Sequence, residues 1–492
     1  MKSFFLVTAS LYFTLTIALC VAEEVSEKQA LNIGGDKQLL IDDLFFEQSE
    51  NIHLAMHPAH KTGEHNLVRD RPWENATLNW FSFLEDDGVY RMWYECYDVE
   101  GWPTINDTSF CYCESKDGIH WTKPELGLFE YQGSKANNVL FRQIGPEGAH
   151  SRVHGACVFI DSSAPPESRY KAISQGMFPT PPDYRIAGMY SPDGIKWTRY
   201  PKPICNLFAD SQFSGFWDDS KKKYSIYGRV PHRGRALGRA ESEDFEHFPD
   251  LSLVLAPDDN DPPESDLYNS AATKYQFADG VYFMFPSLFQ HDTQTLDIRL
   301  AVSRDGIKWT YPDQKTPFIP LGKEGEFDSG SLYMGQGMIR HEDELYLYYG
   351  GSQLNHAEGQ LENLTQPTGS RIFSRVTVPL DRFVSAEADA KGGYFITPPL
   401  IFEGNTLELN SEIHDDGYVR VAVLDIEGQP FKNRRAEDCL PVSGRKNVKQ
   451  VFWKTDGDVS AYAGKPVRLR IELSNANLYS LQFKQGYPYQ VK

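Results

Sequence analysis

The chain has 492 residues, 40% of them hydrophobic, and a formal net charge of −19 at pH 7. This length exceeds that of one typical domain, so two or more units are expected. The deficit of Lys and Arg argues against a nucleic-acid or anionic-membrane partner, because phosphate binding requires concentrated cations. The aromatic content of 13% is high. In a β-rich protein most such rings form core, and others offer surfaces on which sugars stack.

The first 22 residues have the features of a signal peptide. Lys2 supplies a positive charge, the stretch from Phe4 to Leu19 is almost wholly apolar, and the small residue Ala22 precedes Glu23. An uncleaved membrane anchor is the alternative. No later stretch approaches the roughly 18 apolar residues that span a bilayer. We therefore expect an exported protein, periplasmic or secreted, that has no membrane contact after cleavage.

Six cysteines follow this leader, and none belongs to the C-x-x-C pairs typical of metal sites. In an exported protein a disulfide could join Cys96 to Cys111 or to Cys113 across adjacent strands. Free buried thiols are the alternative. The six are Cys96, Cys111, Cys113, Cys157, Cys205 and Cys439.

One seven-residue pattern, Ser-x-Asp-Gly-x-x-Trp, recurs at 115–121, 191–197 and 303–309. A degenerate copy without the Gly and the Trp lies at 242–248. The serines that begin the four copies lie 76, 51 and 61 residues apart. Periods near 50 residues are typical of propeller blades of four strands each. Ser and Asp side chains accept hydrogen bonds from nearby amides, Gly permits a positive φ, and Trp fills the seam between strands. We expect these Asp-box aspartates to be structural and not catalytic.

Alternating strands separated by turn residues predict an all-β protein with five propeller blades over 67–380. A lead-in segment at 23–66 is expected to wrap the propeller, and short strands after Asp381 predict a C-terminal β-sandwich over 381–492. The predicted strands lie at 80–84, 89–94 and 109–114 in blade one; 155–160, 170–173 and 184–190 in blade two; 215–217, 224–227 and 236–240 in blade three; 271–277, 281–285 and 296–302 in blade four; 334–339, 345–349 and 371–378 in blade five; and 407–409, 419–424, 451–453, 467–473 and 478–483 in the sandwich.

Short segments at 40–43, 71–74, 115–128, 137–138, 169–171, 327–330, 348–351 and 478–483 carry a family resemblance. Through them the chain resembles secreted five-bladed propeller proteins of polysaccharide-degrading bacteria, related to the invertase/levanase and arabinanase types of glycoside hydrolase. The resemblance covers nearly the whole mature chain and implies the fold and a site at the propeller mouth. The invertase motifs do not map. Asp70-Arg71-Pro72 is not their Arg-Asp-Pro, and Glu95-Cys96 lies in blade one, where their acid is not expected. No catalytic triad is carried over.

The innermost strand of each propeller blade starts at one mouth of the central channel, so acids at these starts converge. A glycosidase needs one carboxylic acid that protonates the leaving oxygen and a second carboxylate that acts as nucleophile or activates water. Arginine and histidine could hold hydroxyls, a uronate or a sulfate, and Trp could stack on a sugar. The predicted catalytic residues are Glu74, Asp210, Asp266 and Asp328, and the predicted substrate-binding residues are Arg71, Trp73, Arg152, His154 and Tyr268.

Alternatives remain open for several acids. Asp266 and Asp328 could cap loops, and Glu264 and Glu326 are interpreted as flanking loop acids. The acidic loop at 258–261 could bind a structural Ca²⁺, with a solvated loop as the alternative. No other metal and no cofactor is predicted.

The sequence predicts an exported glycoside hydrolase that acts on a polysaccharide or its oligosaccharides. One alternative is a non-catalytic carbohydrate-binding propeller, favoured by the missing invertase motifs. A sialidase is the other, because the Asp box is frequent there, although those enzymes use six blades, a Tyr nucleophile and three Arg residues on the sugar carboxylate.

Overall fold

The computed structural model describes residues 30–99, 108–142, 153–179, 182–208, 210, 212–358, 371–443 and 448–489. The predicted signal peptide lies outside these ranges. Strands dominate, so the all-β prediction is confirmed. Within the described ranges, no helix is long and apolar enough to cross a membrane. The short 3-10 helices are η1 (Asp43–Phe45), η2 (Pro72–Glu74), η4 (Pro166–Ser168), η5 (Ala436–Asp438) and η6 (Ser460–Tyr462).

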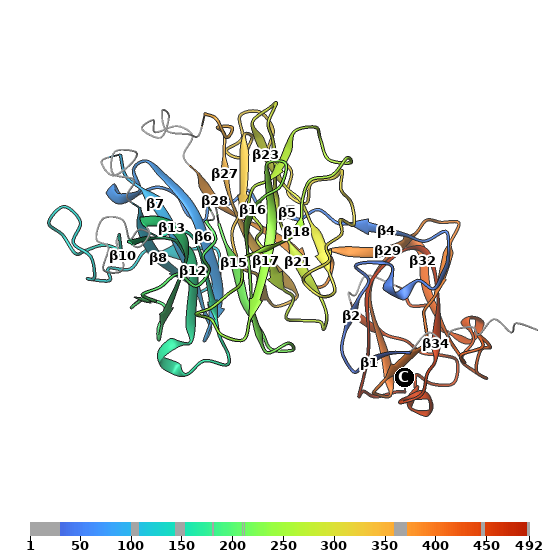
Figure 1. Cartoon of the computed structure of the whole chain (residues 1–492). Coiled ribbons are helices and arrows are strands. Elements are labelled where there is room, and N and C mark those ends of the chain that lie inside the picture. Colours follow the sequence, from blue (N-terminus) through green and yellow to red (C-terminus); the bar gives the residue numbers. More distant parts are fainter. Residues whose placement is uncertain are drawn as a thin grey trace, which may run out of the picture.

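Three antiparallel sheets form the first three blades of a β-propeller (Figure 1). Each sheet is built from strands that follow one another along the chain, as alternating apolar segments joined by turns predict. The first holds β6 (Thr77–Asp86), β7 (Val89–Tyr97), β8 (Ser109–Ser115), β9 (Trp121–Thr122) and β10 (Val139–Phe141); the second β11 (His154–Ile160), β12 (Tyr170–Pro179), β13 (Pro182–Ser191) and β14 (Thr198–Arg199); the third β15 (Ser214–Asp218), β16 (Lys223–Pro231), β17 (Arg235–Ser242) and β18 (Ser252–Leu255).

The fourth blade is an eight-stranded sheet, so the structure has four blades and the predicted five are not confirmed. The last two sequence repeats share one sheet because β23 and β25 pair in parallel at Leu296 and Ser331. This sheet holds β19 (Ser265–Leu267), β22 (Ser287–Gln290), β23 (Thr295–Ile298), β25 (Ser331–Met334), β26 (Ile339–His341), β27 (Glu344–Ser352), β28 (Ile372–Pro379) and β5 (His60–Lys61), and a small sheet beside it holds β20 (Thr273–Lys274), β21 (Tyr282–Met284) and β24 (Ala301–Ser303).

The complete Asp-box turns have the predicted geometry. In the second copy, Ser191 Oγ accepts a hydrogen bond from the amide of Gly194 at 2.9 Å, and Asp193 Oδ1 accepts from the next two amides. Gly194 has a φ of +75°, and a Cβ there would lie 2.6 Å from Trp93 Cζ2 of the first blade. The glycine therefore serves both the turn and the close packing between blades. Its carbonyl accepts from Trp93 Nε1, as that of Gly118 does from Tyr348 and that of Gly306 from Tyr227.

A second β unit lies beside the propeller, at the right of Figure 1. Two long antiparallel strands, β32 (Thr406–Leu424) and β34 (Arg468–Lys484), organise its eight-stranded sheet. The predicted two-sheet sandwich is not confirmed, since all but two strands of this unit belong to that one sheet. Its other members are β2 (Gln38–Leu39), β3 (Gln48–Glu50), β4 (His53–Met56), β29 (Val384–Ala388), β30 (Gly393–Ile396) and β33 (Val448–Gln450), and the parallel pair β1 (Leu31–Gly34) and β31 (Leu400–Phe402) stands apart.

The lead-in segment joins this second unit more than it wraps the propeller. Strands β1 to β4 all pair with strands of the second unit, and only β5 pairs with the propeller. The reason is burial: Ile33, Leu40 and Phe45 lie in the apolar core of the second unit. Asp381, where the sandwich was expected to begin, is buried and accepts from Tyr275 and Lys37.

Candidate active site

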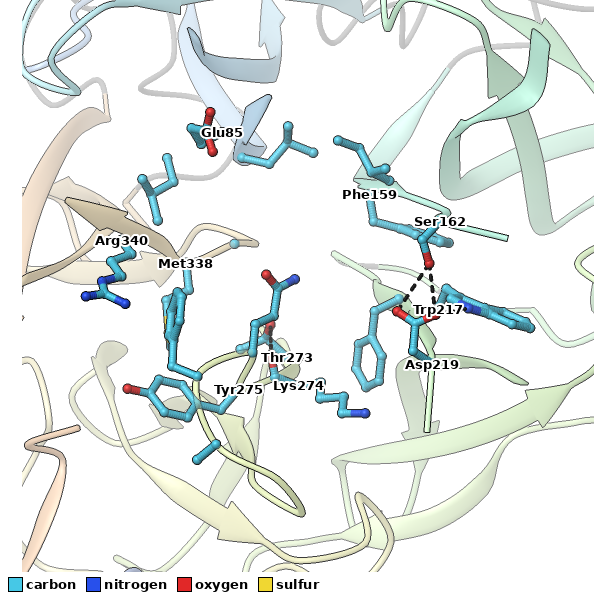
Figure 2. Close-up of a pocket in the computed structure, with 18 of the residues that line it drawn as sticks. Glu85, Phe159, Ser162, Trp217, Asp219, Thr273, Lys274, Tyr275, Met338 and Arg340 are labelled. Carbon is cyan, nitrogen blue, oxygen red and sulfur yellow. Dashed lines mark hydrogen bonds between the residues drawn. The ribbon is translucent and has the colours of Figure 1, made fainter. Parts of the chain in front are cut away.

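The inner segments of the propeller run in one direction along its axis. Residues 83–85 of β6, 158–160 of β11 and 215–217 of β15 all line one cavity of about 1340 Å³. Figure 2 shows side chains from several sheets around the open centre of this cavity. Because each inner strand ends at this cavity, the starts of the same strands lie at the opposite end. We call that opposite end the mouth.

Two charged residues that line the large cavity, Asp219 and Lys274, bind groups of its walls. Asp219 accepts from Ser162 Oγ and from Trp217 Nε1, both at 2.9 Å. Lys274 Nζ donates to Asp218 Oδ1 at 2.6 Å. These groups hold turns in place and do not form an acid and base pair across the cavity.

At the mouth, one imidazole joins two carboxylates from different blades. His154, the first residue of β11, has Nδ1 2.8 Å from Glu95 Oε1 and Nε2 3.1 Å from Asp210 Oδ1. Glu95 is 1% exposed, whereas Asp210 is 40% exposed and also accepts from Arg229 Nη2 at 2.7 Å. The chain of groups therefore runs from a buried acid to an acid that faces solvent.

Burial raises the pKa of Glu95, but the charge of His154 and hydrogen bonds from His154, Tyr97 and the Gly155 amide lower it further, so the net pKa lies below its ordinary value. An ionised Glu95 fixes Nδ1 of His154 as an N–H donor. Nε2 and Asp210 then share one proton, because their contact is a hydrogen bond only when one of them carries it. This leaves Asp210 an oriented carboxylate at the edge of the solvent.

A second carboxylate, Asp266, begins the fourth blade beside this chain. It accepts from the amide and Nη1 of Arg235 at 2.8 and 2.7 Å and contacts His291 Nε2 at 2.8 Å. Burial raises its pKa, but these hydrogen bonds and the charge of Arg235 outweigh burial and lower it. Gly234 permits the contact: its φ is +116°, and a Cβ there would lie 2.0 Å from Asp266 Oδ1.

A smaller cavity of about 600 Å³ is lined by Asp266 and by Arg229, the partner of Asp210. Glu264 lies in its wall, exposed, and its carboxyl group makes no side-chain hydrogen bond or ion pair with the part of the chain that the structure describes. Its φ of +56° is in the left-handed region, a strained conformation that is concentrated at functional sites. The cavity is lined by Arg229, Arg233, Gly234, Arg235, Glu264, Ser265, Asp266 and His291.

Three packed aromatic rings, which we call the floor, lie next to this cavity under Arg235: Tyr268 is partly buried, and Trp80 and Tyr333 are buried. Trp80 stacks on Tyr268 with centroids 6.1 Å apart and meets Tyr333 edge-on at 5.4 Å. The guanidinium of Arg235 lies 5.1 Å from the centroid of Tyr268. Burial raises the pKa of Tyr268 and the charge of Asp210 adds to this increase, while Arg235 and two other arginines oppose it. Tyr268 of the floor therefore lies within electrostatic reach of Asp210.

Four of the predicted site residues meet at this mouth: His154, Asp210, Asp266 and Tyr268. Arg152 lies outside the described residues. The other four lie elsewhere, in contacts that hold the fold together.

Glu74 is fully buried under the first blade, where Tyr94 and Lys123 donate to it at 2.6 and 2.7 Å. The neighbouring Trp73 is also buried and donates to Asn138 at 3.0 Å. These two residues were expected at the mouth, but η2 turns them into the blade interior, because their carboxylate and indole find buried partners there.

Asp328 is buried at the closure of the propeller. It accepts from Tyr349 at 2.6 Å and pairs with Lys61 of β5. Arg71 is half exposed and lies 3.6 Å from Asp70. Neither residue makes a contact with Asp210 or Asp266 that the structure describes.

The sequence interpretation missed Glu95, because the family motif did not expect an acid in blade one. An available signal was a lone acid inside the apolar strand Val89–Tyr97, since such acids are rarely buried unless they are paired. Arg229 and Arg235 flank a tight hairpin and gave no signal. The acidic loop at 258–261 bonds to itself and to Gln314, and no group of three metal-binding side chains is found among the described residues.

No family model matches the chain, and no curated protein matches it. Solved structures resemble it at low identity. A glycosyl hydrolase from Bacteroides ovatus has a TM-score of 0.48 at 14% identity and covers 70% of this chain and 97% of its own. A structure reported with the GH130 family of mannoside phosphorylases has a TM-score of 0.44 at 15% identity, covering 66% and 94%. An N-acetylgalactosamine deacetylase from F. plautii has a TM-score of 0.45 at 13% identity, covering 67% and 96%. Likeness at this level concerns the fold alone.

Proposed function

We propose that the protein is a carbohydrate-active enzyme, a glycoside hydrolase whose reaction centre is the mouth. The observation that carries the proposal is the exposed carboxylate of Asp210, oriented by His154 and Glu95, beside a cavity with a second, unpartnered acid and an aromatic floor. Two carboxyl groups are what glycosidic cleavage requires.

Asp210 is proposed as the carboxylate that attacks the sugar or activates water. The ion pair with Arg229 favours its ionised form, which both roles need. Glu264 is proposed as the acid that protonates the leaving oxygen, because it is an exposed lining residue of the cavity whose carboxyl group has no hydrogen-bond partner among the described residues. Asp266 is a positioning residue that holds Arg235 and His291 toward the cavity.

The test is a screen of purified protein against plant and algal oligosaccharides, read by new reducing ends and product masses. Asp210→Asn and Glu264→Gln should each lower turnover by about 100- to 10,000-fold. Asp219→Asn is the matched control, since Asp219 lines the large cavity at the other end of the axis. If both mouth variants keep the wild-type rate, the site is wrong. If wild-type protein binds glycans and never cleaves them, the protein is a binding module.

A hydrolase with a tyrosine nucleophile, as in sialidases, is the second candidate. One observation favours it: the charges of Arg235, Arg229 and Arg371 all act on Tyr268, and so does that of Asp210. The raised pKa keeps Tyr268 protonated, so Asp210 would have to take its proton. Tyr268→Phe should then abolish turnover, whereas in the first proposal it weakens binding and leaves kcat within about tenfold.

We also propose the domain architecture and the export from the cell that the sequence predicts. The eight-stranded sheet would act as blades four and five, residues 381–492 would form a sandwich-like domain completed by strands β1 to β4 of the lead-in segment, and the first 22 residues would direct export. N-terminal sequencing of the exported protein tests the last point, and Glu23 is the expected first residue.

A further inference from the structure

Arg371 is a partly buried guanidinium at the mouth that has no carboxylate partner among the residues the structure describes. The other two arginines that face the floor are paired, Arg229 with Asp210 and Arg235 with Asp266. Arg371 instead donates through Nη1 to the side chain of Asn79. A cation withdrawn from water without a counter-charge is unfavourable, so a bound anion would stabilise it.

Stacking on aromatic rings fixes the orientation of the Arg371 guanidinium. Its Cζ lies 3.9 Å from the ring centroid of Tyr333 and 5.7 Å from that of Trp80. Gly350 makes room for the stem, because a Cβ there would lie 2.8 Å from Arg371 Cδ. An arginine has five N–H donors in a fixed plane, and Asn79 takes one. The remaining edge suits the bidentate geometry of a carboxylate or a sulfate.

The electrostatic potential around Arg371 also favours a bound anion. Burial lowers the pKa of His356 to about 4, and the charges of Arg235 and Arg371 contribute to that decrease. His356 contacts Tyr333, the ring on which Arg371 stacks, at 3.0 Å. A positive site of this kind in a chain of net charge −19 is a local feature and does not reflect overall composition.

The subsite is continuous with the acids of the mouth. Asn79 Nδ2 donates to Tyr97 Oη at 3.0 Å, and Tyr97 donates to Glu95 at 2.5 Å. One chain of hydrogen bonds therefore leads from Arg371 to the carboxylate that orients His154. A group held by Arg371 would lie beside the proposed reaction centre.

We propose that Arg371 binds an anionic substituent of the sugar, the carboxylate of a uronic acid or a sulfate ester. The inference rests on the proposed function, because it names the substrate class of the same site.

Titration calorimetry on wild-type protein tests it with monosaccharides, which contain no bond to cleave. The probes are uronic acids of gluco, galacto and manno configuration, the matching 6-sulfated hexoses, and the neutral hexoses. At least one anionic probe should bind about 10- to 100-fold more tightly than its neutral counterpart. A preference for uronic acids alone identifies the carboxylate as the ligand, and one for sulfated sugars alone identifies the sulfate.

Arg371→Met should remove this preference, so that anionic and neutral sugars bind with affinities within about threefold of each other. Arg371→Lys should retain part of it, because lysine keeps the charge but not the planar fork. Gly350→Ala adds a methyl group that displaces the stem of Arg371 and leaves the guanidinium chemically unchanged. This variant should also lower the preference for anionic sugars. Arg340→Met, at the large cavity, is the matched control.

An unchanged preference in Arg371→Met, or no anionic preference in wild-type protein, would overturn the inference. These results are distinct from failure of the proposed function. Cleavage of neutral oligosaccharides without anionic preference removes only the inference, and anion binding without any cleavage removes only the hydrolase.

Discussion

Glu95 and His154 are joined by a contact of 2.8 Å that crosses from the first blade to the second. Glu95 lies deep in β7, and His154 opens β11, 59 residues later. The contact brings a buried negative charge to the inner nitrogen of an imidazole whose outer nitrogen faces solvent-exposed Asp210. The orientation of Asp210 therefore depends on an acid that itself never reaches the solvent.

Glu95→Gln should lower kcat by about 100-fold and leave KM nearly unchanged, because the amide no longer fixes the tautomer of His154 while the sugar-binding surface stays intact. Steady-state kinetics on the oligosaccharide found in the screen measures both constants. Glu95→Asp should recover part of kcat. A rise in KM alone would contradict a positioning role.

Glu74→Gln should lower the free energy of unfolding by about 1–3 kcal/mol, because Lys123, whose side chain is 5% exposed, loses its buried counter-charge and keeps only the half-exposed Asp70 as a partner. Urea denaturation followed by tryptophan fluorescence gives this value. The kcat of the folded fraction should equal that of wild type. A large loss of kcat without a loss of stability would return Glu74 to the reaction centre.

The pKa of His356, lowered by burial and by nearby arginines to about 4 from its ordinary 6.5, makes stability depend on pH. Between these values the unfolded chain binds more protons than the folded one, so stability falls as pH falls from 6.5 to 4. His356→Gln should remove a component on the order of 2 kcal/mol from that decrease. Unfolding midpoints at pH 7, 5.5 and 4.5 check this, and identical pH slopes in both proteins would refute it.

Gly194→Ala should lower stability by about 2–4 kcal/mol, because the new methyl group meets Trp93 and the backbone keeps a positive φ. Gly88→Ala is the matched control: its φ is +73°, but nothing lies within 4 Å of the added Cβ. The control should lose only about 1 kcal/mol. Equal losses would show that packing between blades contributes nothing at this turn.

The six cysteines after the leader are free and buried. Cys96 and Cys111, one of the pairs expected to form a bridge, have their Sγ atoms 3.6 Å apart. Burial raises the pKa of Cys157 to about 12 and also raises that of Cys96. Thiol reagents should therefore label none in the native protein and all six after unfolding without reductant. Labelling of only four after unfolding would indicate one disulfide.

The sequence by itself determined what depends on local chemistry. The Asp-box turns form as predicted, because the Ser and Asp side chains bond to amides two or three residues away, and Asp193 and Asp305 are structural for that reason. The starts of inner strands also located Asp210 and Asp266 at one mouth, since strand direction follows from the order of strands in a blade.

Tertiary structure decided which groups the acidic side chains bind and which distant strands pair. Glu74 and Asp328 also precede inner strands, yet each is bound by a lysine distant in sequence, Lys123 and Lys61, and turned away from the mouth. Glu95 reaches the site only because β7 and β11 lie side by side in space. The merging of the last two repeats into one sheet depends on the single bridge between Leu296 and Ser331. Ion pairs and strand pairing between distant segments depend on how blades pack around the axis, and no local pattern of residues encodes that arrangement.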